Sequence, residues 1–432
     1  MKKRIFASLL VGVMTVSVMA QISSTVSPYS QFGFGVLSDQ SQGFNKGMGG
    51  LAMGLRGGGI INMQNPASYS AVDSLTMIFD LGISGQITNF KEGGKRVNGR
   101  TGSFDYGVGS FRLLRKVGVG FGIVPFSSIG YDYSHDEKVG TSSNYTSELH
   151  SGDGGFTQAF AGLGWEMMKG LSVGFNFSYF WGRYDKQILL ASSDENVNTL
   201  TKSYSASVSS YKLDFGVQWQ KLLKKYNLLT LGATVGIGHD LNEDAELWTS
   251  NVNVNSEKMS NDTMRVANAF SLPFSFGVGA TWCYQNSLTA GFDYQLQKWG
   301  SLKYPKQNLQ TGNYELMDGQ LKDRHKVTLG VDWIPEPNPM MRRKFLKRIH
   351  YRLGFSYATP YYKIDTADGP KELGVSAGLG IPIINSWNNR STLNISAQWI
   401  HSSAPNMVTE NTFRINIGLT FNERWFAKWK VD

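Results

Sequence analysis

Apolar and polar residues alternate with a period of two along most of the chain after residue 73. In one run Leu171, Phe175 and Tyr179 share a parity, and Asn176 and Ser178 take the other. Successive side chains of a strand point to opposite faces, so this pattern predicts strands with one apolar and one polar face. The same register recurs in 272–282, 288–296, 373–381, 392–399 and 413–421.

The alternation predicts about fourteen antiparallel strands. They lie near 74–90, 102–113, 117–135, 144–166, 170–191, 197–220, 227–240, 263–284, 287–299, 321–334, 348–363, 371–384, 390–402 and 411–424. An even number of strands fits a bacterial barrel whose two ends lie on the same side of the membrane.

A soluble β-sandwich also alternates, but two features favour a transmembrane barrel. The polar parity is rich in Gly, Ser, Thr and Asn, which suits a crowded lumen better than a solvated face. The apolar parity often begins or ends in Trp or Tyr, as the aromatic girdles of membrane barrels do. A closed barrel also leaves no edge strand. We therefore predict an all-β fold, a transmembrane antiparallel β-barrel with lipid outside.

The connections between predicted strands alternate in length, as they do between the two sides of a membrane. Short ones fall at 115–116, 168–170, 285–286 and 385–389, and longer polar ones at 91–101, 136–143, 241–262 and 300–320. One connection on the short side is long. It holds three prolines within 335–339, followed by Arg342, Arg343, Lys344, Lys347 and Arg348. This basic run predicts a short helix at lipid headgroups or a periplasmic protein contact, with a solvated turn as the alternative.

The N-terminus has the three parts of a secretory signal peptide. Lys2, Lys3 and Arg4 precede an apolar stretch, and small residues before Gln21 predict cleavage after residue 20. The composition agrees with an exported membrane barrel. Of 432 residues 49 are Gly, aromatics reach 13% and charged residues only 17%, against a typical charged fraction of about 25%. Cys283 stands alone, so no internal disulfide forms.

Other classes find little support in the sequence. No further apolar run has the length of a membrane-spanning helix, and the scattered charge of an exported chain gives no sign of nucleic-acid binding. The pairs Ser134-His135 and His401-Ser402 lack the context of an activated nucleophile, so we expect no enzyme. The histidines show no metal-ligand spacing, and the glycine-rich runs lack the rest of a phosphate loop. We expect no metal and no cofactor.

The segment before the first strand differs from the rest. The segment is 21–73, and within it residues 28–73 show little period-two pattern and are dense in glycine, with apolar residues such as Phe34, Leu51 and Ile61. A solvated linker would not carry so many apolar residues. We predict that this segment packs inside a barrel formed by 74–426 as a plug, and that 427–432 form a short periplasmic tail.

The plug-like segment ends in Asn65-Pro66-Ala67, just before the first predicted strand. A glycine-rich N-terminus with this motif, followed by about fourteen strands, resembles the FadL-type family of outer-membrane long-chain fatty acid transporters. The resemblance implies that Asn65, Pro66 and Ala67 mark an N-terminal hatch. It also implies a lateral opening at a kink in the third strand, where Pro125 and Phe126 stand. Proline removes a ladder donor, so Pro125 predicts a break or bulge by itself.

The expected function is therefore passive, porin-like transport of hydrophobic small molecules such as fatty acids, with lipid transport gated by the plug and exit sideways near Pro125. The resemblance also includes PorV-like members that serve secretion systems. The alternative function is a scaffold or shuttle component of an outer-membrane secretion or assembly complex, with a periplasmic or outer-membrane protein partner. Fold does not decide between the two.

Overall fold

The computed structural model describes residues 25–138, 144–224, 226–253, 255–256, 258–337, 344–383, 391–405 and 407–424. The predicted signal peptide and the predicted tail at 427–432 lie outside these residues, as do Arg342 and Arg343. Among the described residues no helix is long and apolar enough to cross a membrane.

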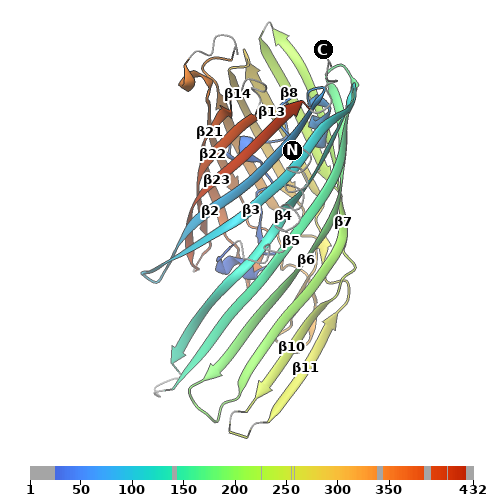
Figure 1. Ribbon diagram of the computed structural model, residues 1–432. Coiled ribbons are helices and arrows are strands. Elements are labelled where there is room, and N and C mark those ends of the chain that lie inside the picture. The colour runs from blue at the N-terminus through green and yellow to red at the C-terminus, as the bar shows by residue number, and fades with distance from the viewer. Residues whose placement is uncertain are drawn as a thin grey trace, which may run out of the picture.

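Fourteen antiparallel strands form a closed barrel, which confirms the predicted fold class (Figure 1). They are β2 (Thr76–Glu92), β3 (Lys95–Leu114), β4 (Val117–Lys138), β5 (Tyr145–Met168), β6 (Leu171–Ser192), β7 (Thr199–Lys224), β8 (Asn227–Gly236), β13 (Ser275–Tyr284), β14 (Leu288–Gln297), β17 (Arg324–Trp333), β18 (His350–Ala358), β21 (Lys371–Ile383), β22 (Ser391–Ser403) and β23 (Thr409–Arg424). The last strand pairs with the first from Thr76↔Arg424 to Lys91↔Thr409, and this pairing closes the ring.

The two faces of the strands differ as the alternation predicts. On β6, Phe177 and Tyr179 are each 50% exposed, whereas Asn176 and Ser178 are buried against the lumen. Exposed tryptophans gather near one rim, at Trp165, Trp219, Trp282 and Trp333, and exposed Tyr179, Tyr211 and Trp399 lie toward the other. An apolar outer belt between two aromatic girdles is typical of a barrel in the bacterial outer membrane. The rim that holds Thr76 and Arg424 is then the periplasmic one.

On the extracellular side, part of the barrel wall continues as a projecting sheet (Figure 1). Strands β4 to β7 are much longer than β13 or β14, and β7 pairs beyond the ring with β10 (Ala245–Val252), which pairs with β11 (Met259–Val266). Two predictions are wrong here. The connection 241–262 is not a polar loop, and 263–284 is not one strand, because Ala269 and Phe270 turn inward as buried residues and Pro273 offers no ladder N–H.

The predicted loop at 91–101 is wrong as well. Strands β2 and β3 meet in a tight turn at Gly93 and Gly94, and Lys95 already pairs with Glu92. Both glycines have positive φ, of 52° and 84°, which is the conformation that two-residue hairpins require.

Three extracellular connections carry further short antiparallel strand pairs. They are β9 (His239–Asp240) with β12 (Ser271–Leu272), β15 (Tyr304–Gln307) with β16 (Tyr314–Met317), and β19 (Lys363–Ile364) with β20 (Ala367–Asp368). The predicted strands 227–240 and 348–363 were too long, because β8 ends at Gly236 and β18 at Ala358.

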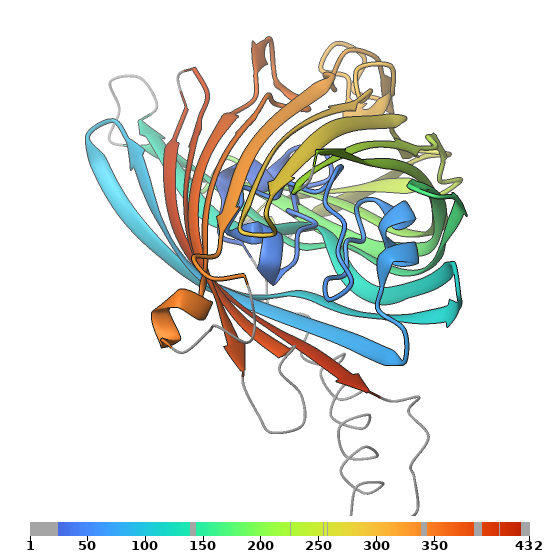
Figure 2. The ribbon, with the colours of Figure 1, turned by 90° about the horizontal axis from the view of Figure 1, so that it is seen from above.

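Residues 25–73, called the luminal segment below, lie inside the ring of strands (Figure 2). Their regular elements are short: η1 (Pro28–Gln31), β1 (Val36–Leu37), α2 (Gly43–Lys46) and η2 (Pro66–Ala71). One further 3-10 turn, η3 (Phe345–Arg348), stands at the periplasmic rim. The luminal segment and the lumen-facing side chains together form the interior of the molecule.

Candidate functional site

The luminal segment is fixed to the far wall by a carboxylate. Asp293 on β14 is 1% exposed and accepts hydrogen bonds from the backbone N–H groups of Ala52 and Met53, at 2.5 and 2.9 Å. Hydrogen bonds to a charged group contribute about 1.5–3 kcal/mol each. On the next strand, the Thr281 hydroxyl donates to the carbonyl of Gly54 at 2.7 Å. The segment is therefore held through its backbone.

The Asn65-Pro66-Ala67 motif is a second anchor. The Asn65 side chain begins η2 by accepting from the N–H of Ala67 at 3.2 Å. Its amide nitrogen donates to the carbonyl of Met53 at 2.8 Å and to that of Val217 on β7 at 3.3 Å. The motif thus ties two parts of the segment to each other and to the wall. Asn65, Pro66 and Ala67 are all buried.

Glycines on the strands let the backbone of the segment touch the wall. A Cβ atom on Gly174 would lie 2.4 Å from the carbonyl carbon of Pro66, and one on Gly232 would lie 1.8 Å from the Met53 carbonyl oxygen. Real Cβ atoms do not approach backbone so closely, so these strand positions need glycine where the segment crosses them.

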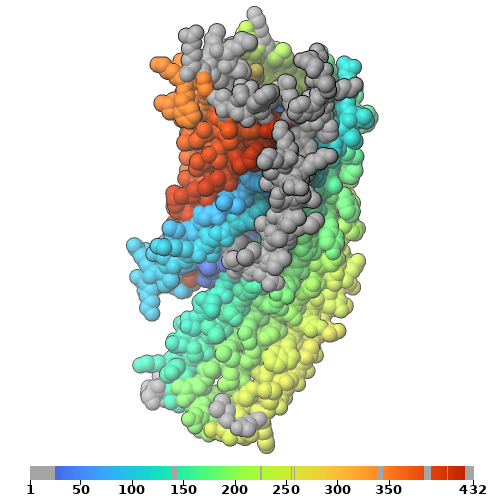
Figure 3. Space-filling view, viewed as in Figure 1, coloured from blue at the N-terminus to red at the C-terminus, as the bar shows by residue number. Residues whose placement is uncertain are grey.

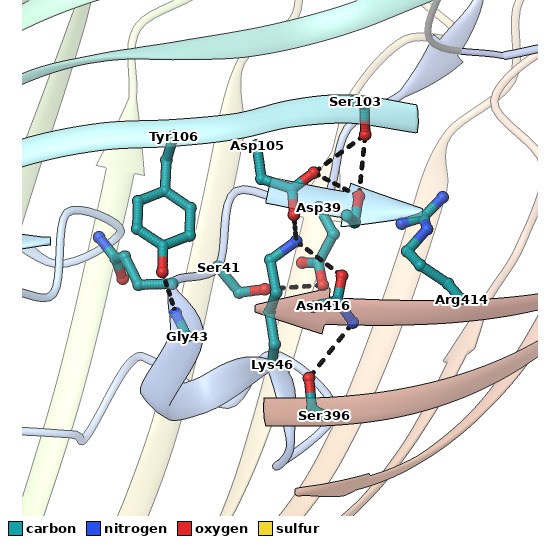
Figure 4. A network of polar contacts seen from close by, with 12 residues as sticks. Asp39, Ser41, Gly43, Lys46, Ser103, Asp105, Tyr106, Ser396, Arg414 and Asn416 are labelled. Atoms are coloured by element: carbon teal, nitrogen blue, oxygen red, sulfur yellow. Dashed lines mark hydrogen bonds and ion pairs between the residues drawn. The ribbon is translucent and has the colours of Figure 1, made fainter. Parts of the chain in front are cut away.

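A polar network joins α2 to the opposite strands (Figure 4). Lys46 is 2% exposed, and its Nζ lies 2.8 Å from a carboxylate oxygen of Asp105 and 3.3 Å from the amide oxygen of Asn416. The hydroxyl of Tyr106 accepts from the N–H of Gly43 at 2.7 Å. Separating the partners of a buried ion pair is strongly destabilising, so Lys46 fixes the position of α2.

Asp39 extends this polar region toward β17. Its carboxylate lies 3.5 Å from Lys326 Nζ and accepts from the Ser41 hydroxyl at 2.8 Å. Burial raises the pKa of Asp39, but the charges of Lys326 and Lys46 and the Ser41 hydrogen bond outweigh it, and the pKa lies below its ordinary value. The carboxylate is therefore ionised at neutral pH.

A cavity of about 150 Å³ lies beside Asp39, on the side of the lumen formed by β17 to β23. Its lining includes Arg324, Glu372, Glu410 and Arg414. Arg324 and Glu372 form an ion pair at 3.0 Å, and Arg414 donates to Gln86 at 2.8 Å. This side of the lumen is polar and charged. Within the described residues, no group of three or more His, Cys, Asp or Glu side chains is arranged to hold a metal ion.

Strands β3 and β4 separate halfway up the wall. They pair from Leu114↔Val117 only as far as Gly107↔Ile123. The β2–β3 ladder continues to the extracellular turn and β5 follows β4 to Lys138, so each strand keeps its other neighbour. Figure 3 shows the β2–β3 hairpin diverging from the β4–β7 extension.

Pro125 and Phe126 stand where the two strands part. The β4–β5 ladder shifts register between Pro125 and Ser127, which is the bulge that the proline predicts. Phe126 is the extra residue, and its buried ring packs against Phe180 with centroids 5.1 Å apart. A role for these two residues as a lateral opening stays a prediction.

The free edge of β4 is occupied by the chain's own N-terminal residues. Strand β1 pairs with it antiparallel, Val36 opposite Ser128 and Leu37 opposite Ser127. Nearer the extracellular end of β4, the Ser30 hydroxyl accepts from the N–H of Gly130 at 3.0 Å. On the other side Val26 packs against β3, because a Cβ on Gly99 would lie 2.4 Å from its side chain. The N-terminal residues thus fill the space between β3 and β4.

Behind β1 lies an aromatic cluster in the extracellular half of the barrel. Phe34 contacts Phe156, Phe270 and Trp299, with ring centroids 5.2–5.6 Å apart. Buried Lys186 borders the cluster and donates to the carbonyl of Gln31 at 2.7 Å. The cluster combines strand residues with residues of the extracellular connections.

Sequence reasoning missed Asp293, Lys46, Asp105 and Lys186. Their one signal was a charged residue at a lumen-facing position of a strand, or within the glycine-rich segment. Of the predicted basic contact, Lys344, Lys347 and Arg348 lie at η3, where both lysines are exposed. A periplasmic protein partner there stays a prediction.

Comparisons with solved structures support the fold. The toluene transporter TodX of Pseudomonas putida matches with a TM-score of 0.61 and 15% identity, over 90% of this chain and 100% of that one. The toluene transporter TbuX of Ralstonia pickettii matches at 0.56 and 14%, over 87% and 96%. A FadL homologue of Pseudomonas aeruginosa matches at 0.58 and 12%, over 88% and 97%. The FadL-type architecture expected from the sequence is confirmed as a fold.

Among curated proteins, none matches the chain. A family model described as BamG matches residues 1–432, the full length of the sequence. The chain therefore belongs to the BamG family.

Proposed function

We propose that this protein is an outer-membrane transporter of hydrophobic small molecules, which leave the lumen sideways between β3 and β4. The observation that carries the proposal is the parting of these strands at Ile123, with β1 on the edge of β4. A paired wall would keep an apolar molecule from the lipid, whereas an unpaired stretch closed by a removable segment offers a path. The similarity of fold to named toluene transporters supports this reading.

The proposed route begins at the aromatic cluster around Phe34. A hydrophobic ligand taken up from outside exchanges places with cluster side chains and displaces β1 from Ser127 and Ser128. The few hydrogen bonds that hold β1 and η1 to β4 contribute about 2–5 kcal/mol in total. A ligand with six methylene groups recovers about 5 kcal/mol when these groups leave water. Binding of a hydrophobic ligand therefore provides enough free energy to displace β1 from β4.

A route through the luminal segment toward the periplasm requires more free energy than displacement of β1. It would break the hydrogen bonds to Asp293, the Asn65 anchor and the buried ion pair of Lys46 with Asp105. Removing one partner of a buried ion pair alone costs about 3–5 kcal/mol. The comparison favours lateral exit, with the luminal segment as a plug that stays in place. Fatty acids, the substrates that the family resemblance implies, belong to the ligand class proposed.

Uptake by whole cells tests the proposal. Cells without the protein should accumulate a hydrophobic probe, such as radiolabelled toluene or a long-chain fatty acid, several-fold more slowly, and a plasmid copy should restore the rate. Growth on a hydrophilic carbon source is the control. Unchanged uptake of both probes would rule out transport of this class.

A second function, a scaffold in an outer-membrane assembly or secretion complex, is favoured by the extracellular extension. Strand β11 pairs with β10 alone among the described residues, and most of its side chains are exposed. A free strand edge can pair with another chain. Mild-detergent purification followed by mass spectrometry tests this function: a stoichiometric protein partner, lost when Met259–Val266 is replaced by a Gly-Ser linker, would support it.

A further inference from the structure

The turn η3 projects from the outside of the barrel at the periplasmic rim (Figure 2). Phe345 is 56% and Leu346 67% exposed, although both are large apolar residues. Lys344 and Lys347 on either side of them are also exposed. Within the ranges that the structure describes, neither lysine forms an ion pair.

Contacts with the outer face hold η3 at the level of the lower aromatic girdle. Tyr351 donates from its hydroxyl to the carbonyl of Leu346 at 3.1 Å. Its ring packs beside Trp333, which is 48% exposed on the lipid side, with centroids 5.7 Å apart. The turn therefore lies beside the acyl-chain boundary of the periplasmic leaflet rather than beneath the lumen.

Three other periplasmic turns repeat this combination of residues. Leu113 and Leu114, 55% and 64% exposed, precede the β3–β4 turn, and Met167 and Met168, 42% and 60% exposed, lie at the end of β5. Leu222, 64% exposed, lies near the end of β7. An exposed basic residue adjoins each group: Arg115 and Lys116, Lys169, and Lys221.

We propose that these turns form a collar that binds anionic phospholipid of the periplasmic leaflet, with η3 as its strongest point. The basic collar consists of Arg115, Lys116, Lys169, Lys221, Lys344 and Lys347. Apolar side chains next to basic ones suit the boundary between acyl chains and headgroups. Lys221 already shows this arrangement, because its Nζ lies 5.7 Å from the ring centre of exposed Trp219.

Lipid fits the collar better than an acidic protein does. The apolar members on β3, β5 and β7 are continuous with the lipid-facing belt of the same strands, and η3 contacts that belt through Tyr351. A protein bound there would have to displace lipid. A phosphate headgroup meets the lysines without that displacement. Lipid binding by the collar is independent of what the barrel transports.

Lipid titration of the purified full chain in detergent, followed by native mass spectrometry, tests the collar. The probes are phosphatidylglycerol and zwitterionic phosphatidylethanolamine. Phosphatidylglycerol should bind more tightly, and K344Q/K347Q should bind it about 30-fold more weakly, since each lysine contributes about 1 kcal/mol at an anionic surface. The matched control is K95Q/R96Q, which removes the same charge from the exposed extracellular hairpin of β2 and β3 and should bind like the parent.

Two results would overturn the proposal. One is unchanged phosphatidylglycerol affinity in K344Q/K347Q, which would leave η3 to a protein partner. The other is an equal loss in K95Q/R96Q, which would show that net charge alone sets binding. A second variant, F345S/L346S, should shorten the residence of the lipid while the barrel keeps its heat-modifiable migration on gels.

Discussion

The carboxylate of Asp293 accepts a hydrogen bond from the backbone N–H of Met53 at 2.9 Å, although 240 positions separate the two residues. The same carboxylate holds the N–H of Ala52. One acidic side chain on a lumen-facing strand position thus fixes the middle of the luminal segment. Because the contact is with backbone, it sets where the segment runs without demanding a particular side chain from it.

Replacing Asp293 should loosen this part of the segment. Asp293→Ala removes the acceptor of two backbone N–H groups, each hydrogen bond being worth about 1.5–3 kcal/mol. Hydrogen exchange at Ala52 and Met53 should become at least tenfold faster in D293A. In D293N the exchange rate should lie between those of D293A and the parent, because the amide still offers one acceptor. Asp262→Ala, on exposed β11, is the control. Unchanged protection in D293A would contradict the anchor.

A methyl group at Gly232 should displace the segment as well. The new Cβ would overlap the Met53 carbonyl oxygen, and backbone cannot yield as a flexible side chain does. Gly232→Ala should therefore make the segment around Met53 sensitive to added protease while the barrel still folds. Gly85→Ala is the matched control, since nothing lies within 4 Å of a Cβ there. Equal protease resistance in both variants would count against contact at Gly232.

At Asn65, aspartate and alanine should have different effects on the luminal segment. The amide nitrogen faces the carbonyl oxygens of Met53 and Val217. Asn65→Asp brings a carboxylate oxygen against both, whereas N65A leaves them unpaired at about 1–3 kcal/mol each. Single-channel recordings in planar bilayers should show longer openings for N65D than for N65A. Closed channels in N65D would mean that the motif does not hold the segment.

Most of the barrel could be predicted from the sequence, but little of its interior could. Alternation predicted the strands because the lipid face and the lumen face differ in polarity at every step. It failed at 263–284, where apolar Phe270 turns into the aromatic cluster instead of facing lipid. The alternation also could not predict the partner of Asp105. A period-two pattern indicates which face of a strand a residue occupies, but not which residue lies opposite it in the lumen. Lys46 is 59 positions away, and the path of the luminal segment inside the barrel brings it there.

The region around Pro125 also has one feature that the sequence predicts and others that it does not. Proline predicted the bulge, since it removes a ladder donor. The separation of β3 from β4 depends on pairings along two whole strands, and the occupation of the free edge by Val36 and Leu37 depends on the path of the luminal segment. Neither the separation of these strands nor the occupation of the free edge can be predicted from a local sequence pattern.

The most direct test of lateral transport is a disulfide across β1 and β4. Leu37 and Ser127 are paired residues, so L37C/S127C in a C283S background should cross-link on oxidation and hold β1 on β4. Each single cysteine variant is a control, and N89C/N98C locks the β2–β3 ladder, where Asn89 pairs with Asn98, without touching β1. Oxidation should abolish uptake of the hydrophobic probe in L37C/S127C alone, and a reductant should restore it. Full uptake by the cross-linked protein would show that the ligand does not pass between β3 and β4.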